Sequence, residues 1–185
     1  IASNSTPVAI PDNTAAGVDS PVTVSGFTTS IGQVVVSLYL THTWDGDLII
    51  SLIGPDSTTR ILSNRRGSSG DNFGSSCGNP TIFDDNASTP ISSGTAPFLG
   101  SYRPDSTLSF FIGKSGSAVN GTWKLHVVDT ASIDTGTIQC WSLTVYSSFT
   151  SIDGGGVCNS VPPNAGFYGS PLSGTSPLTV NFTDT

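Results

Sequence analysis

The chain has 185 residues and a net charge of −7, and all 13 of its acidic residues are aspartate. Serine, threonine, glycine and proline abound, whereas glutamate, lysine and arginine, which usually cover helix surfaces, are scarce. This composition excludes a helical bundle. Six basic residues on an acidic chain also argue against nucleic acid or an anionic membrane as a partner.

Short segments of β-branched and aromatic residues alternate with turn clusters, which predicts an all-β protein. The expected strands cover residues 5–10, 21–24, 33–41, 47–53, 59–62, 107–112, 121–128 and 136–146. In the last of them Trp141, Leu143 and Val145 would face one side, and Ile138 and Cys140 the other. About eight short strands of this kind form a β-sandwich, and a jelly roll is the expected topology.

Residues 63–106 interrupt this pattern with few strand signals and much Gly, Ser, Asn, Asp and Pro. A segment this long without regular structure is uncommon in a compact domain and is often functional.

The composition changes again near residue 150. Residues 1–148 would form the sandwich, and residues 149–163 are a Gly- and Pro-rich linker. Residues 164–185 would begin a second domain, because two extended segments cannot bury a core alone.

Six stretches between residues 3 and 146 occur in a characteristic order. They are residues 42–59, 70–73, 83–87, 96–104, 120–125 and 134–143. The first resembles the H-x-x-x-x-D-L-x-I-x-L-x-S-P-x-G-T stretch of P domains, and the others resemble later motifs of the same family. P domains follow the catalytic domain of proprotein convertases and occur on many secreted bacterial proteins. Residues 164–185 resemble the opening strands of a polycystic kidney disease (PKD) domain, with P-x-A-x-F, S-G-x-x-P-L-T-V and F-x-D-T present.

The resemblance implies a jelly-roll sandwich without catalytic residues of its own, which stabilises or targets an attached hydrolase, most readily a protease. It implies an extracellular, monomeric module whose partner is that catalytic domain, with a protein or polysaccharide substrate as a further ligand. The alternative is an independent binding or adhesion module for collagen, polysaccharide or a cell surface.

One stretch matches a catalytic motif. Residues 134–137 have the D-T-G-T sequence of aspartic proteases, which need two such loops to share a proton between carboxylates. The chain has one copy, in which Asp134 opens a turn into the last expected strand. We therefore expect no enzymatic activity from the chain itself.

Pairs of aspartates suggest a metal site. Asp45 with Asp47, and Asp84 with Asp85, lie in two loops that the P-domain resemblance brings close together. Adjacent carboxylates repel one another, and Ca²⁺ accepts about six to eight oxygen ligands from loops of this kind. We expect calcium on Asp47 and the Asp84/Asp85 pair, and a second site on Asp129 and Asp134, which flank another turn. The candidate ligands are Asp45, Asp47, Asp84, Asp85, Asp129 and Asp134. The alternative is a set of solvated turn residues that each cap their own backbone.

The three cysteines permit one disulfide and leave one thiol over. Cys77 lies in the long loop and Cys140 on the face of the last strand away from Trp141, so a bridge between them would tie the loop to the sandwich. A Cys140–Cys158 bridge would instead hold the linker. Closing the longer loop restricts the unfolded chain more, which favours Cys77–Cys140 and leaves Cys158 free.

Overall fold

The computed structural model describes residues 1–148, 167–170, 179 and 181–184. The chain separates into two compact units, Ile1–Phe149 and Thr150–Thr185. In the second unit, β11 (Phe167–Ser170) pairs antiparallel with β12 (Asn181–Asp184). The linker expected at residues 149–163 and Cys158 lie outside the described residues. None of the helices in the described part of the chain is long and apolar enough to cross a membrane.

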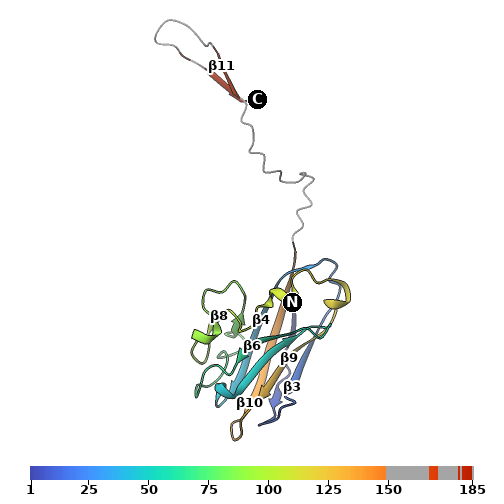
Figure 1. The fold of residues 1–185 in the computed structure, drawn as a ribbon, viewed down its shortest axis with the longest axis vertical. Helices are drawn as coiled ribbons and strands as arrows, with labels where there is room; N and C mark the ends of the chain where they lie inside the picture. Colours follow the sequence, from blue (N-terminus) through green and yellow to red (C-terminus); the bar gives the residue numbers. More distant parts are fainter. Residues whose placement is uncertain (149–166, 171–178, 180, 185) are drawn as a thin grey trace. The chain divides into compact units, whose positions relative to one another are not determined.

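The first unit is a sandwich of two β-sheets (Figure 1). One sheet has the order β1–β10–β4–β7–β8, with β2 also paired to β10, and the other has the order β3–β9–β5–β6. The strands are β1 (Ala2–Asn4), β2 (Val8–Ile10), β3 (Val18–Val24), β4 (Ile31–His42), β5 (Leu48–Ile53), β6 (Thr59–Asn64), β7 (Thr81–Phe83), β8 (Gly100–Tyr102), β9 (Gly121–Asp129) and β10 (Gly136–Ser147). The predicted all-β sandwich is confirmed, and residues 1–148 contain ten strands where about eight were expected.

Four short 3₁₀ helices connect the strands within residues 1–148. They are η1 (Asp45–Asp47), η2 (Ile91–Ser93), η3 (Leu108–Phe111) and η4 (Gly116–Ala118). The strand predicted at residues 107–112 is wrong, because η3 occupies this segment. Phe111 is buried against Trp123, with ring centroids 4.9 Å apart, while Phe110 is 63% exposed. The helical turn therefore splits two adjacent phenylalanines between core and solvent, and this tertiary packing overrides their β-propensity.

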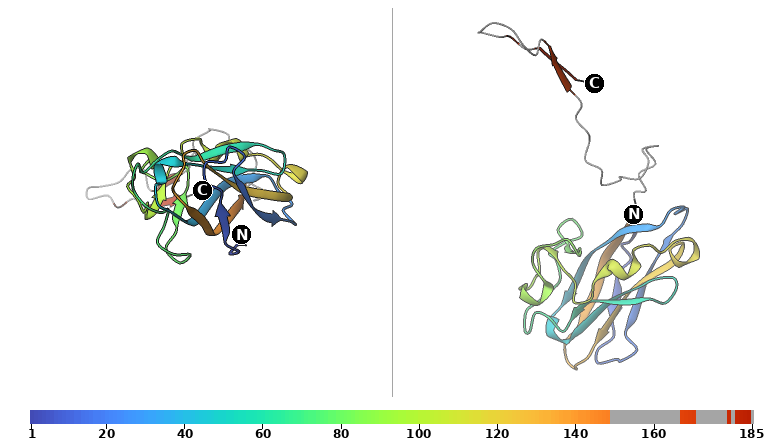
Figure 2. Two further views of the ribbon diagram at one scale, coloured as in Figure 1. Left: turned by 90° about the horizontal axis from the view of Figure 1, so that it is seen from below. Right: turned by 45° about the horizontal axis from the view of Figure 1, so that its top comes forward.

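The core lies between the two sheets, which Figure 2 shows as stacked layers. Alternate residues of the long strands supply it, since successive side chains of a strand point to opposite faces. Each fully buried aliphatic or aromatic side chain stabilises the fold by about 1.5–3 kcal/mol. The buried side chains of the central strands are Val34, Val36, Leu38 and Leu40 of β4, Ile50 and Leu52 of β5, and Trp123, Leu125 and Val127 of β9.

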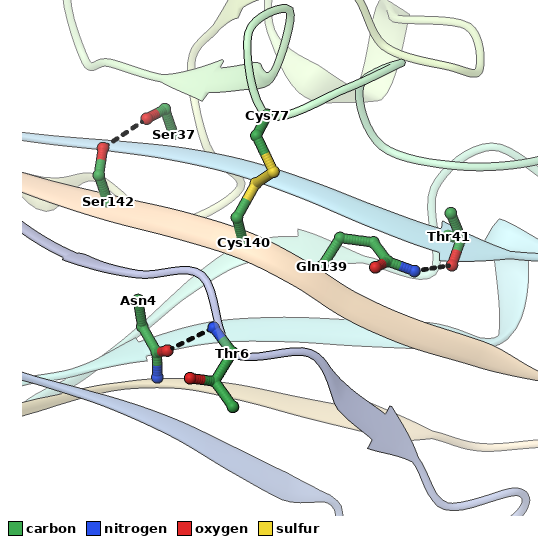
Figure 3. Close-up of a disulfide and its surroundings, with 8 residues drawn as sticks. All are labelled: Asn4, Thr6, Ser37, Thr41, Cys77, Gln139, Cys140 and Ser142. Carbon is green, nitrogen blue, oxygen red and sulfur yellow. Dashed lines mark hydrogen bonds between the residues drawn. A yellow bond between two sulfur atoms is a disulfide. The ribbon is translucent and has the colours of Figure 1, made fainter.

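β10 contains a bulge that the sequence pattern does not reveal. Its pairing with β4 shifts register between Ile138 and Cys140. Because the extra residue breaks the alternation, Ile138 and Trp141 both lie in the core, at 1% and 3% exposure. Cys140 points away from the core toward Cys77 (Figure 3). The prediction that Ile138 shares a face with Cys140 is therefore wrong.

The long segment after β6 is fastened to the outer part of the first sheet. Phe73 forms a bridge with Leu40 of β4, and β7 pairs with the same strand. The rings of Phe73 and Phe98 stack with centroids 4.5 Å apart, and both are fully buried. The segment thus extends the hydrophobic core, although its sequence shows little periodicity.

A disulfide joins Cys77 of this segment to Cys140 of β10, with Cα atoms 6.0 Å apart (Figure 3). This is the pairing that loop length favoured in the sequence. The bridge closes a loop between residues 63 positions apart and holds the long segment to the central strands.

We predict that the Cys77→Ser/Cys140→Ser double variant folds but loses about 4 kcal/mol of unfolding free energy, because closure of a loop this long restricts the unfolded chain. Urea denaturation of the oxidised wild type and the double variant measures the difference. Peptide mapping without reductant provides the control: a peptide that joins Cys140 to Cys158 would contradict the pairing.

Candidate functional site

Asp45, Asp47 and Asp129 lie at the end of the sandwich where β4 ends and β5 begins. Asp47 is 7% exposed, and its main-chain oxygen accepts hydrogen bonds from the N–H and Oγ1 of Thr130, at 3.0 and 2.7 Å. Asp129 is buried, and its Oδ2 lies 3.2 Å from Nε2 of His42, which is also buried. The imidazole gives this carboxylate a polar partner, without which its burial would be costly.

Asp84 lies far from these residues. Its Oδ1 accepts a hydrogen bond from Nε2 of Gln33, 3.0 Å away, near the start of β4. Asp129 contacts His42 at the other end of the same strand, and nine residues of β-strand span roughly 30 Å. The calcium site expected on Asp47 together with the Asp84/Asp85 pair is therefore wrong, because the length of β4 separates its two halves.

Asp85 holds the start of η3. Its carboxylate accepts hydrogen bonds from the main-chain N–H groups of Leu108 and Ser109 and from Oγ1 of Thr107. The first N–H groups of a helix have no partner within the helix, and an aspartate near its start satisfies them. Asp85 lies more than twenty positions before the residues that it contacts, so the sequence does not reveal this role. Without it, the Asp84-Asp85 pair in a loop was interpreted as part of a metal site.

Asp134 has a local role in the turn before β10. Its Oδ1 accepts a hydrogen bond from Oγ1 of Thr43 at 2.8 Å, and that hydroxyl accepts one from the N–H of Thr135 at 3.2 Å. Asp129 is directed at His42 and Asp134 at Thr43, so each carboxylate of the pair expected to form the second site has a protein partner. Asp134 and Thr135 of the D-T-G-T stretch end the turn between β9 and β10, and its Gly136 and Thr137 are the first residues of β10.

Asp45 differs from the other aspartates because its burial is not compensated. Its side chain has 0% exposure, and Oδ1 accepts one hydrogen bond, from the N–H of Asn72 at 3.0 Å. Oδ2 is buried and has no hydrogen-bond partner. Burial raises the pKa of Asp45 to about 8; the Asn72 N–H opposes this rise and the charge of Asp71 adds to it.

Asp45 is contacted by Gly70 and Asn72, residues for which we predicted no chemical role from the sequence. Asp71 and Asn72 belong to the stretch 70–73, which was notable only for its resemblance to a P-domain motif. Within the described ranges, no three or more His, Cys, Asp or Glu side chains are grouped so as to hold a metal ion. Of the six candidate ligands, only Asp45 has a buried side-chain oxygen without a hydrogen-bond partner in the described part of the chain.

We predict that Asp85→Ala lowers the unfolding free energy by about 2 kcal/mol, because η3 loses a charged acceptor for two N–H groups. Urea denaturation in Ca²⁺ and in EDTA measures the effect, which we expect to be equal in both. A loss that appears only in Ca²⁺ would show that Asp85 is a metal ligand after all.

Comparison with known proteins identifies relatives for the first unit. The chain is 32% identical over 142 residues to leupeptin-inactivating enzyme 1 of Streptomyces exfoliatus. It is 33% identical over 141 residues to the transglutaminase-activating metalloprotease of Streptomyces mobaraensis. Each match covers 76% of this chain but only 25% and 14%, respectively, of the relatives, so the chain spans a quarter or less of their length.

Among solved structures, the serine protease of Aeromonas sobria in complex with its chaperone ORF2 matches with a TM-score of 0.47 and 22% identity, over 74% of this chain and 24% of that one. The family model of the proprotein convertase P-domain matches residues 31–82 and 104–145, half of the chain. The matched residues run from the start of β4 into β10 and include His42 at the end of β4, Asp47 in η1 and Asp129 at the end of β9. The chain therefore belongs to the proprotein convertase P-domain family.

Proposed function

We propose that the chain is the non-catalytic accessory domain of a secreted multidomain hydrolase, a protease, and that it stabilises this enzyme or directs it to its substrate. The observation that carries the proposal is the membership of the P-domain family together with the small share of each relative that the chain matches. One of these relatives is named a metalloprotease, and most of its length lies outside the match. A protease domain elsewhere in the same polypeptide is the partner that this arrangement favours.

The chemistry of the described residues supports an accessory role. Asp134 of the only catalytic-type motif is hydrogen-bonded to Thr43 in a turn, and His42 is buried against Asp129. A general base must reach the proton that it removes, and both ring nitrogens of His42 already face protein groups: Nδ1 the main chain of Trp44, and Nε2 the carboxylate of Asp129. The Cys77–Cys140 disulfide is typical of proteins that fold in an oxidising compartment, which supports secretion.

The second unit supports a further part of the proposal. The antiparallel pair β11–β12 would be the opening pair of strands of a PKD domain, in agreement with the motifs at residues 164–185. A two-stranded pair is marginal in water by itself, so such a domain would need the strands that follow.

We predict that deletion of residues 1–148 from the parent enzyme shortens its half-life at elevated temperature. The initial rate on a small peptide substrate should fall by a smaller factor than the half-life does. The stabilising role requires the first effect, because the sandwich contributes contacts but no reacting groups. The measurement is residual peptidase activity over time, and deletion of residues 150–185 alone is the matched control.

The isolated chain should hydrolyse neither casein nor gelatin. Turnover that survives repurification and disappears in Asp134→Ala would contradict the accessory role. A parent protein composed of repeated P and PKD modules without a catalytic domain would favour the alternative, an extracellular adhesion module.

A further inference from the structure

The carboxyl group of Asp45 is incompletely hydrogen-bonded within the part of the chain that the structure describes. Its Oδ2 is fully buried, and none of the described residues donates a hydrogen bond to it. Because a buried polar atom without a partner costs about 1–3 kcal/mol, and a charged one more, a ligand outside the chain is the natural complement.

The segment that covers Asp45 brings main-chain oxygens to it. The carbonyl oxygen of Gly70 accepts from the N–H of Asp45, and that of Ser68 accepts from the N–H of Gly46, both at 2.8 Å. Each carbonyl oxygen has a second lone pair for another ligand. Gly67, at φ +100°, approaches so closely that a Cβ there would lie 2.8 Å from the Cβ of Asp45. The backbone of residues 67–72 therefore packs closely against the main chain and Cβ of Asp45, and its Asn72 N–H reaches the carboxylate.

The two arginines before this segment fix its start. Nε of Arg65 donates to the carbonyl oxygen of Gly46 at 3.1 Å. Arg66 forms a two-nitrogen ion pair with Asp105, in which the shortest distance is 2.7 Å. The contacts of Arg65 and Arg66 therefore help to hold residues 67–72 beside Asp45, in addition to the contacts with Asp45 itself.

A second carboxylate lies next to Asp45. Asp71 lies between Gly70, whose carbonyl oxygen accepts from the N–H of Asp45, and Asn72, whose N–H donates to Asp45 Oδ1. Its charge also raises the pKa of Asp45. Asp71 is exposed and, with Asn72, His42 and Thr43, lines a depression of about 330 Å³, through which solvent reaches Asp71.

We propose that Asp45 and Asp71, together with main-chain carbonyl oxygens of residues 67–72, bind one Ca²⁺ ion. All of these ligands are oxygens, and no imidazole or thiol is among them, which favours a hard cation. In the described residues this site brings together two carboxylates and no group of three or more His, Cys, Asp or Glu side chains. Ca²⁺ routinely completes its coordination with carbonyl oxygens and water at an irregular loop. Mg²⁺ demands a strict octahedron and fits such a loop less well.

The site is distinct from the calcium site expected from the sequence and goes beyond the proposed accessory function. It uses Asp71, which was not among the expected ligands, and excludes Asp84, Asp85 and Asp134, which have protein partners. Its role would be to hold the long segment against the start of β5. The disulfide holds the same segment to β10.

Thermal unfolding of the whole chain tests the site. At a hundredfold excess of free Ca²⁺ over the dissociation constant, we expect the melting temperature to rise by roughly 5–10 °C above its value in EDTA. Asp45→Asn and the exposed Asp71→Asn should each abolish this rise. Asp134→Asn, which alters an aspartate in a neighbouring turn, is the matched control and should respond as the wild type does.

Terbium luminescence provides a second readout that does not depend on stability. Trp44 precedes Asp45 in the chain, so Tb³⁺ bound at the site should emit on tryptophan excitation, and Ca²⁺ should displace it more effectively than Mg²⁺ does. Asp71→Asn should reduce the emission even if Asp45→Asn fails to fold.

Two results would overturn the proposal. One is equal Ca²⁺ dependence of the melting temperature in the wild type and in both Asp→Asn variants. The other is a wild-type melting temperature that is the same in Ca²⁺ and in EDTA.

Discussion

The antiparallel pairing of β4 with β10 is the contact on which the rest of the first unit depends. The two strands run side by side from Ile31 opposite Ser147 to His42 opposite Gly136. Their inner faces supply the core, β7 pairs along the edge of β4 away from β10, and Cys77 is bonded to Cys140 on the outer face of β10. The acidic end of the sandwich is also defined by this pair, because His42, the last residue of β4, reaches Asp129. Loss of the pairing would remove core, disulfide anchor and polar cluster together.

The long segment after β6 shows how a region with little regular structure can be firmly anchored. It is held by the bridge from Phe73 to Leu40, by the stacked ring of Phe98 and by the disulfide, three contacts of different physical kinds. Its polar sequence is needed because its backbone must turn repeatedly, yet its three phenylalanines are fully buried. Functional side chains in such a segment are positioned by the sandwich, as is common for loops on a β scaffold.

Alternation along the chain predicted the sandwich well, because β4, β5 and β9 each bury every second residue. It failed where a distant contact decides the local structure. Residues 108–111 form a helical turn because Asp85 binds its first N–H groups, a contact between residues more than twenty positions apart. The same kind of contact separated Asp84 from Asp47 and joined Asn72 to Asp45. The P-domain motifs revealed that these stretches matter, but spacing in the sequence does not contain the distances between them.

The bulge at Gln139 has a consequence for how sequences of this module can diverge. Downstream of it, each residue of β10 faces the side opposite to the one that strict alternation from Ile138 would assign. Removal of one residue here would turn Trp141 and Leu143 toward solvent, or Cys140 into the core. We therefore expect β10 to tolerate a substitution more readily than the insertion or deletion of a residue, because a change of length moves every later side chain to the opposite face.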